Sequence, residues 1–174
     1  MSQEIINRVA NSKLETIDLE LFFPKIERIS FDIKPWLKDE LFLLEKEFRE
    51  RVKNFDWKKY KNKVVYITCS NDAIIPDWAY ILVSSQFNSH EIKNVIGSKE
   101  ILNIKLITDM VNAFDFSIYK GKPVIIKGCS DQKIPLSAYS ILLEKLQLEA
   151  KSIMFGEACS SVPIYKSSKN PNEV

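Results

Sequence analysis

The sequence predicts an α/β fold built from two similar halves. Three observations lead to this prediction: residues 55–84 align without a gap over residues 114–143, a β-rich run lies at the same place in both stretches, and a helical apolar pattern follows each run. Similarity at a fixed offset indicates a repeated structural unit. We therefore expect helix-strand-loop-helix-strand units that form one mixed sheet with helices packed on it, and an approximate two-fold between the halves.

The two aligned stretches are identical at 12 of 30 positions. The repeat predicts a first unit over 41–97 and a second over 100–156. We expect the N-terminal segment, 1–40, to pack on this core and the C-terminal extension, 157–174, to end in a disordered polar tail. The whole would form one compact domain. The identical pairs are Phe55/Phe114, Asp56/Asp115, Tyr60/Tyr119, Lys61/Lys120, Lys63/Lys122, Val65/Val124, Ile67/Ile126, Asp72/Asp131, Ile75/Ile134, Pro76/Pro135, Ala79/Ala138 and Tyr80/Tyr139.

The individual elements follow from local patterns. Residues 2–10 predict a short helix, and Ile29, Phe31 and Ile33 alternate with polar residues as in a half-exposed strand. The β-rich runs KVVYIT and KPVIIK predict strands buried on both faces. The helices after them begin at Pro76 and Pro135, because proline is tolerated in the first turn. A second strand follows each helix, so a βαβ crossover is expected.

Composition excludes several functional classes. The 174 residues are 45% apolar and 28% charged, as in ordinary globular proteins, and 25 Lys and Arg against 23 Asp and Glu give a net charge of +2. This balance predicts neither nucleic-acid nor membrane binding. The sequence MSQEIINRVANSK at the start has no signal-peptide run, and nothing later is apolar enough to span a membrane, so we expect a cytoplasmic protein.

The three cysteines are each followed by serine, in CSNDAIIP from 69, CSDQKIP from 129 and CSSVP from 159. The first two pairs follow a predicted strand, at the carboxyl edge where open α/β folds bind ligands. If the loops converge, Cys69, Cys129 and Cys159, with Asp72 or Asp131, would offer ligands for zinc or part of an iron–sulfur cluster. The spacing matches no recognised metal motif.

Two other interpretations of these loops stay open. In the first, the cysteines are small apolar residues at strand ends, and Ser70, Ser130 and Ser160 bond within turns or cap the next helix. In the second, one cysteine is a catalytic nucleophile. His90, the single imidazole, lies at the far end of the helix, so only Asp72 or Asp131 would remain as the base.

Several aromatic residues lie near these loops. Tyr80 and Tyr139 occupy equivalent positions of the repeat, which favours packing roles, although they would also line a pocket over the loops. Trp78, on the first turn of its helix, suits a partner-binding anchor. The basic stretch KNFDWKKYKNK has a counterpart with only two lysines, NAFDFSIYKGK. We interpret it as a solvated turn and not as a nucleic-acid site.

The strings TCSNDAIIPDWAY, FDIKPWL, KGCSDQKIP and AKSIMFGEACSSVPIYK resemble an uncharacterised Bacteroidota family, domain of unknown function 2480. The resemblance runs from EIINRVANS to PIYK. It implies a small cytoplasmic protein with no assigned activity, encoded near genes of sulfur-mobilising iron–sulfur assembly. No catalytic residue follows from it.

Three hypotheses therefore remain, and none of them fixes a substrate. The first is an accessory or binding protein that holds a metal, a cluster or a sulfur-assembly partner at the Cys-Ser loops, with zinc or an iron–sulfur cluster as cofactor. The second is a small-molecule enzyme that uses a cysteine nucleophile at the same loops. The third is a structural domain that presents Trp78 to a protein partner or to its own copy in a homodimer.

Overall fold

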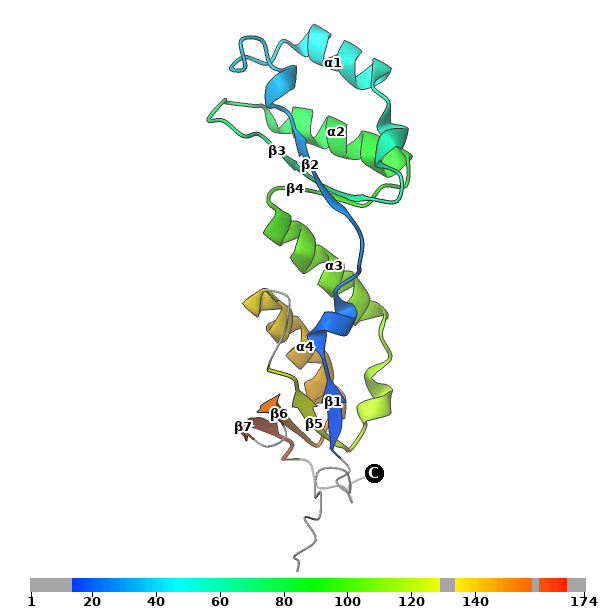
Figure 1. Cartoon of the computed structure of the whole chain (residues 1–174), viewed down its shortest axis with the longest axis vertical. Coiled ribbons are helices and arrows are strands. Elements are labelled where there is room, and N and C mark those ends of the chain that lie inside the picture. Colours follow the sequence, from blue (N-terminus) through cyan, green and yellow to red (C-terminus); the bar gives the residue numbers. More distant parts are fainter. Residues whose placement is uncertain (1–13, 129–133, 158–159, 169–174) are drawn as a thin grey trace, which may run out of the picture. The chain divides into compact units, whose positions relative to one another are not determined.

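The structure is a computed structural model that describes residues 14–128, 134–157 and 160–168. The chain divides into two compact units. Unit 2 is Pro24–Lys105, and unit 1 combines Met1–Phe23 with Leu106–Val174. Unit 2 is thus inserted in the sequence of unit 1, and each unit has its own sheet (Figure 1).

Unit 2 contains a parallel sheet of three strands in the order β2-β3-β4. Two crossover helices, α1 and α2, cover the same face of this sheet, because both contribute to one core with alternate residues of β3 (Figure 1). The elements are β2 (Arg28–Asp32), η2 (Lys34–Trp36), α1 (Glu45–Asn54), η3 (Trp57–Tyr60), β3 (Val64–Thr68), α2 (Asp77–Ser89) and β4 (Asn94–Ile96).

Unit 1 contains a sheet of four strands in the order β1-β5-β6-β7. The first three strands are parallel and β7 is antiparallel to β6, so this sheet is mixed. Its elements are β1 (Glu15–Ile17), η1 (Leu19–Phe22), η4 (Phe116–Tyr119), β5 (Pro123–Ile126), α4 (Leu136–Glu149), β6 (Ser152–Glu157) and β7 (Ser160–Lys166). Helix α3 (Lys99–Ala113) crosses the boundary between the two units.

The predicted α/β class is confirmed, but the prediction of a single mixed sheet is wrong, because the strands form two separate sheets. The reason is that the N-terminal segment is divided between them: β1 pairs with β5, and β2 pairs with β3. Each repeat thereby gains a third parallel strand. The duplication itself and the two-fold between its halves stay predictions.

The two units place their elements in the same order. In both, a strand and a 3-10 turn are followed by a helix, a second 3-10 turn, the central strand, a helix and a third strand. The strand register also shows which residues of the two units occupy equivalent positions. Phe31 lies opposite Ile67 on β3, and Ile17 lies opposite Ile126 on β5, so Phe31 and Ile17 occupy equivalent positions.

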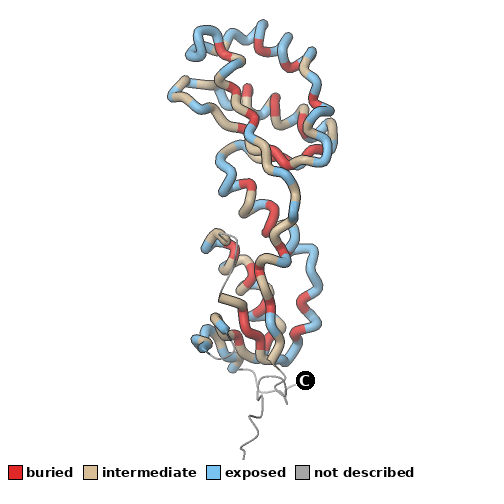
Figure 2. Tube along the Cα trace, in the orientation of Figure 1, coloured by how far each residue is buried: buried red, intermediate tan, exposed pale blue. Residues whose placement is uncertain are grey.

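The two cores differ in aromatic content. Both units have a buried core (Figure 2). The unit 2 core is dominated by rings, whereas several equivalent positions of the unit 1 core carry aliphatic residues. Phe31 and Phe48 of unit 2, for example, correspond to Ile17 and Ile107 of unit 1. The rings that form or pack against the unit 2 core are Phe31, Trp36, Phe48, Phe55, Trp57, Tyr60, Trp78, Tyr80 and Phe87.

The repeated Phe-Asp pairs lie at the two 3-10 turns that precede the central strands. The Asp56 carboxylate accepts the N–H of Lys58 at 3.1 Å, and the Asp115 carboxylate accepts the N–H of Ser117 at 3.0 Å. An aspartate at this position satisfies a backbone donor that the turn leaves free.

Within the described residues, no helix combines the length and apolar composition needed to cross a membrane.

Candidate functional site at the Cys69 edge

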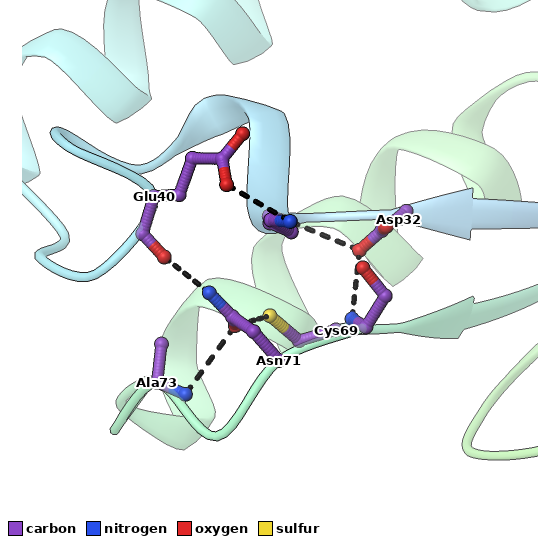
Figure 3. A network of polar contacts seen from close by, with 7 residues as sticks. Asp32, Glu40, Cys69, Asn71 and Ala73 are labelled. Atoms are coloured by element: carbon purple, nitrogen blue, oxygen red, sulfur yellow. Dashed lines mark hydrogen bonds and ion pairs between the residues drawn. The ribbon is translucent and has the colours of Figure 1, made fainter.

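Parallel pairing brings two strand ends together at one edge of the unit 2 sheet. Asp32, the last residue of β2, lies opposite Thr68, the last residue of β3, and Cys69 follows directly. The chain then turns through residues 70–76 into the N-terminus of α2. We call this group of loops the Cys69 edge, and Figure 3 shows its polar contacts.

The Asp32 carboxylate links the two strand ends. Its Oδ1 atom accepts the backbone N–H of Lys34 and of Ser70, each at 3.0 Å. Partial burial favours protonation, but the hydrogen bonds from Ser70 and from the Lys34 N–H, together with the Lys34 charge, outweigh it and lower the pKa of Asp32 below 3.8. The carboxylate is therefore ionised at neutral pH.

The half-exposed Cys69 thiol is held by Asn71 and not by an acid. Its Sγ atom donates to Asn71 Oδ1 at 2.8 Å, and the same oxygen accepts the Ala73 N–H at 3.3 Å. Asn71 Nδ2 donates to the carbonyl oxygen of Glu40, which ties the loop after β3 to the turn before α1 (Figure 3). An amide oxygen is a very weak base, so this hydrogen bond does not activate the thiol, and within the part of the chain that the structure describes no carboxylate is seen to accept from Cys69.

The neighbouring turn has an unusual backbone. Asp39 and Glu40 both adopt left-handed conformations, with φ of 52° and 57°. Such a conformation costs an L residue roughly 1–2 kcal/mol. Glu40 is held there from two sides, by the Asn71 side chain and by an ion pair of 2.9 Å with Lys34 Nζ. The turn and the Cys69 loop thus support each other.

Tyr80 and Trp78 come from the first turns of α2. Tyr80 is half-buried, and burial, followed by electrostatic interactions with Cys69, Asp32 and Asp77, raises the pKa of its phenol above 10.0. Trp78 is also half-buried: its ring packs on Phe48, and the Arg49 guanidinium carbon lies 4.9 Å from its centroid. The role of Trp78 as a partner-binding anchor stays a prediction.

Unit 1 has a related arrangement after β1. Asp18 Oδ1 accepts the Glu20 N–H at 2.9 Å, and Asp18 Oδ2 pairs with Lys127 Nζ at 2.9 Å. Partial burial opposes ionisation, but these contacts lower the pKa of Asp18. Tyr139 packs edge-on against Phe155, and burial, then the Asp18 charge, raises its pKa. An ionised aspartate thus influences a half-buried tyrosine in both units.

Three of the other predicted site residues lie within the described part of the chain. Asp72 and Ser70 are exposed beside Cys69, and Ser160 is the exposed first residue of β7. Among the described residues, no three His, Cys, Asp or Glu side chains gather as metal ligands would. The remaining predicted residues, Cys129, Ser130, Asp131 and Cys159, lie outside the described residues.

Sequence reasoning missed Asp32, Lys34 and Asn71. A signal for Asp32 was present, because SFDIKPW at 30–36 parallels TIDLELF at 16–22, with an aspartate after an apolar strand residue in both. The offset of this match differs from that of the main repeat, since unit 2 is inserted between the two parts of unit 1. The role of Asn71 depends on the distant Glu40 carbonyl and has no local signature.

Asn71→Ala is expected to increase the alkylation rate of Cys69 several-fold. The substitution removes the amide oxygen that holds the thiol and the Nδ2 group that ties the loop to Glu40, so the sulfur becomes more accessible to the reagent. The measurement is iodoacetamide labelling of the full chain, followed by mass spectrometry of the Cys69 peptide. Asp72→Ala, a change at the neighbouring exposed position, is the matched control and should leave the rate unchanged. A slower rate in Asp72→Ala would show that Asp72 acts as the base.

Comparison with known proteins gives one match. Residues 3–167 fit the model of the family described as protein of unknown function (DUF2480). The chain belongs to this family. The match includes the Cys69 edge and both units, so the DUF2480 region is the whole two-unit fold and not one half of it. No curated protein and no solved structure is significantly similar to the DUF2480 chain.

Proposed function

We propose that this DUF2480 protein is a cytoplasmic accessory protein that binds either zinc or an iron–sulfur cluster through its Cys-Ser loops. The observation that carries the proposal is the Cys69 edge itself. A half-exposed thiol lies in a loop that is fastened to an ionised carboxylate, at the strand ends where α/β folds bind ligands. Thiolates select zinc and iron–sulfur clusters among common metal groups.

The residues around Cys69 suit such a role in two ways. The loop is positioned by contacts from both sides, through the Asp32 carboxylate and through the Glu40 carbonyl, and ligands must be held by their surroundings to bind tightly. Cys69 would supply one sulfur, and Cys129, Cys159 and either Asp72 or Asp131 would supply the other ligands. A bound metal would supply charge or redox chemistry there, while the chain provides the thiolates.

Exposed apolar side chains beside this edge suit a protein partner that receives or supplies the metal. Leu41 and Phe42 are 54% and 62% exposed in the turn that Asn71 contacts, and Ile74 is 94% exposed in the Cys69 loop. Apolar residues grouped around a polar site favour protein contacts over contacts with nucleic acid. The small net charge of +2 also favours a protein partner over nucleic acid.

The test is the metal content of protein purified without oxygen and without a metal-affinity tag. We expect about one zinc, or iron with labile sulfide, per chain in the unmodified protein, and a severalfold loss in each of Cys69→Ser, Cys129→Ser and Cys159→Ser. Ser70→Ala is the matched control and should retain the metal.

Two results would contradict the proposal. One is full metal content in all three cysteine variants, and the other is a protein that binds neither zinc nor iron after anaerobic reconstitution. Circular dichroism of each variant distinguishes ligand loss from unfolding. If a single cysteine reacts much faster with iodoacetamide than the other two while no metal is bound, the nucleophile hypothesis replaces this one.

A further inference from the structure

Unit 1 contains an apolar pocket of about 210 Å³ near η1 and the C-terminal end of α3. Ile17 and Tyr119 are buried in its wall, whereas Leu21 and Met110 are 78% and 42% exposed beside it. The lining residues are all uncharged, and Tyr119 is the single one among them with a polar group in its side chain. The pocket is therefore suited to an uncharged, apolar guest.

In unit 2 a phenylalanine ring occupies the inner part of the equivalent space, and only the outer part stays open. Phe31, the counterpart of Ile17, is 3% exposed, and its ring lies among the rings of neighbouring residues. The centroid distances from the Phe31 ring are 5.1 Å to Trp36, 5.7 Å to Phe55 and 6.1 Å to Tyr60. In the aligned sequences these three residues correspond to Phe22, Phe114 and Tyr119.

Those three counterparts all line the unit 1 pocket, together with Ile17. Unit 1 thus retains the aromatic surroundings but carries an isoleucine where unit 2 carries the enclosed ring. Phe22 and Phe114 keep the edge-to-face arrangement, with centroids 5.2 Å apart and planes at 80°. Rings arranged in this way offer both a face and an edge to a further ring.

We propose that this pocket binds the aromatic ring of a small neutral molecule, of a size between a phenyl ring and indole. An apolar cavity of roughly 150 Å³ lined by similar side chains is large enough to bind benzene, so about 210 Å³ accommodates a ring with a fused or attached group. The exposed Leu21 and Met110 leave a way in, and a polar substituent on the ring would stay in water.

The matching hollow of unit 2 supports a specific role for unit 1. It is lined by Trp36, Phe55, Arg51 and Asn54, and the last two correspond to Met110 and Ala113 of the unit 1 pocket. Polar groups therefore stand in unit 2 where unit 1 has apolar ones. A neutral aromatic ring is therefore expected to prefer the unit 1 pocket.

The test is titration of the full chain with indole, followed by NMR line broadening or calorimetry. We expect saturable binding of one indole per chain. Ile17→Phe adds the ring that unit 2 has and should weaken this binding at least about tenfold. Ala113→Trp narrows the opening from an exposed helix end and should weaken indole binding to a similar extent. This second variant keeps the test valid if Ile17→Phe does not fold. Asn112→Trp, an equally large change at the neighbouring exposed position, should bind indole within about twofold of the unmodified protein.

Three results would overturn the inference: no saturable binding of indole, equal affinity in the unmodified chain and in Ala113→Trp, or a dimer that forms without indole and is lost in Ala113→Trp. The last would mean that a second copy occupies the pocket. The experiment is independent of the proposed metal function, because Cys69→Ser leaves this pocket unchanged.

Discussion

Phe31→Ala is expected to lower the free energy of unfolding of unit 2 by about 3–5 kcal/mol, the usual cost of removing a buried phenylalanine ring. Phe31 is 3% exposed, and its ring contacts aromatic side chains that lie between η2 and α2 in the sequence. Its centroid lies 5.6 Å from that of Trp57 and 5.4 Å from that of Phe87, with the Phe87 ring edge-on. Truncation removes these aromatic contacts and leaves a cavity at the centre of the core.

The three tryptophans of the chain make this prediction simple to measure. Trp36, Trp57 and Trp78 all belong to unit 2, so their fluorescence during urea unfolding reports on that unit alone. Ile74→Ala is the control, because Ile74 is 94% exposed, and its effect should stay within about 0.5 kcal/mol. Equal unfolding midpoints in Phe31→Ala and Ile74→Ala would show that the ring cluster does not hold unit 2 together.

Asp32→Ala is expected to lower the free energy of unfolding by about 2 kcal/mol at neutral pH. The substitution removes an ionised acceptor from two backbone N–H groups, of Lys34 and Ser70, and a hydrogen bond to a charged group contributes about 1.5–3 kcal/mol. The exposure of Ser70 reduces the effect, because water can replace part of what is lost. Urea unfolding followed by tryptophan fluorescence measures the change.

Asp32→Asn removes the negative charge but keeps an oxygen that can accept a hydrogen bond, so it separates the effect of the charge on stability from that of the acceptor. The folded-state pKa of Asp32 lies below the ordinary 3.8, so its carboxylate stabilises the fold above that pH, and this stabilisation is lost as the pH falls through the lower folded-state value. The stability difference between the unmodified protein and Asp32→Asn should therefore be constant near neutral pH and shrink below pH 3.8. A difference that stays constant down to pH 2 would mean that the charge has no role.

The elements with a strong local pattern were predictable from sequence. The strand at Ile29 and Phe31, the runs after Lys63 and Lys122, and the helices after Pro76 and Pro135 all form where the residue periodicity placed them. Periodicity shows which face of an element is apolar, but it does not show which strands become neighbours. The N-terminal segment supplies one edge strand to each sheet, β1 to the unit 1 sheet and β2 to the unit 2 sheet. The partners of these two strands, β5 and β3, are set by long-range pairing alone.

The candidate site was predictable only at its chemically distinctive residue. Cys69 stands out because it follows a buried strand and precedes a helix, and both features can be read locally. Asp32 and Glu40 reach the same edge from segments 30 or more residues earlier, through a carboxylate and a backbone carbonyl. A backbone carbonyl carries no sequence signal, and an aspartate at a strand end is common. These partners become visible only when β2 and β3 are seen side by side.

The insertion of unit 2 into unit 1 also fixes the order in which the sheets can form during translation. The β2-β3-β4 sheet has all its strands once Ile96 has left the ribosome, whereas β1 must wait for β5, which ends at Ile126. Until then β1 is an early strand without its parallel neighbour, and such strands invite wrong pairing. Arg28 Nε meanwhile bonds Asn103 Oδ1 at 2.7 Å and joins the entry and exit of the inserted unit. Unit 2 can thus complete its fold first and bring the two separated parts of unit 1 within reach of each other.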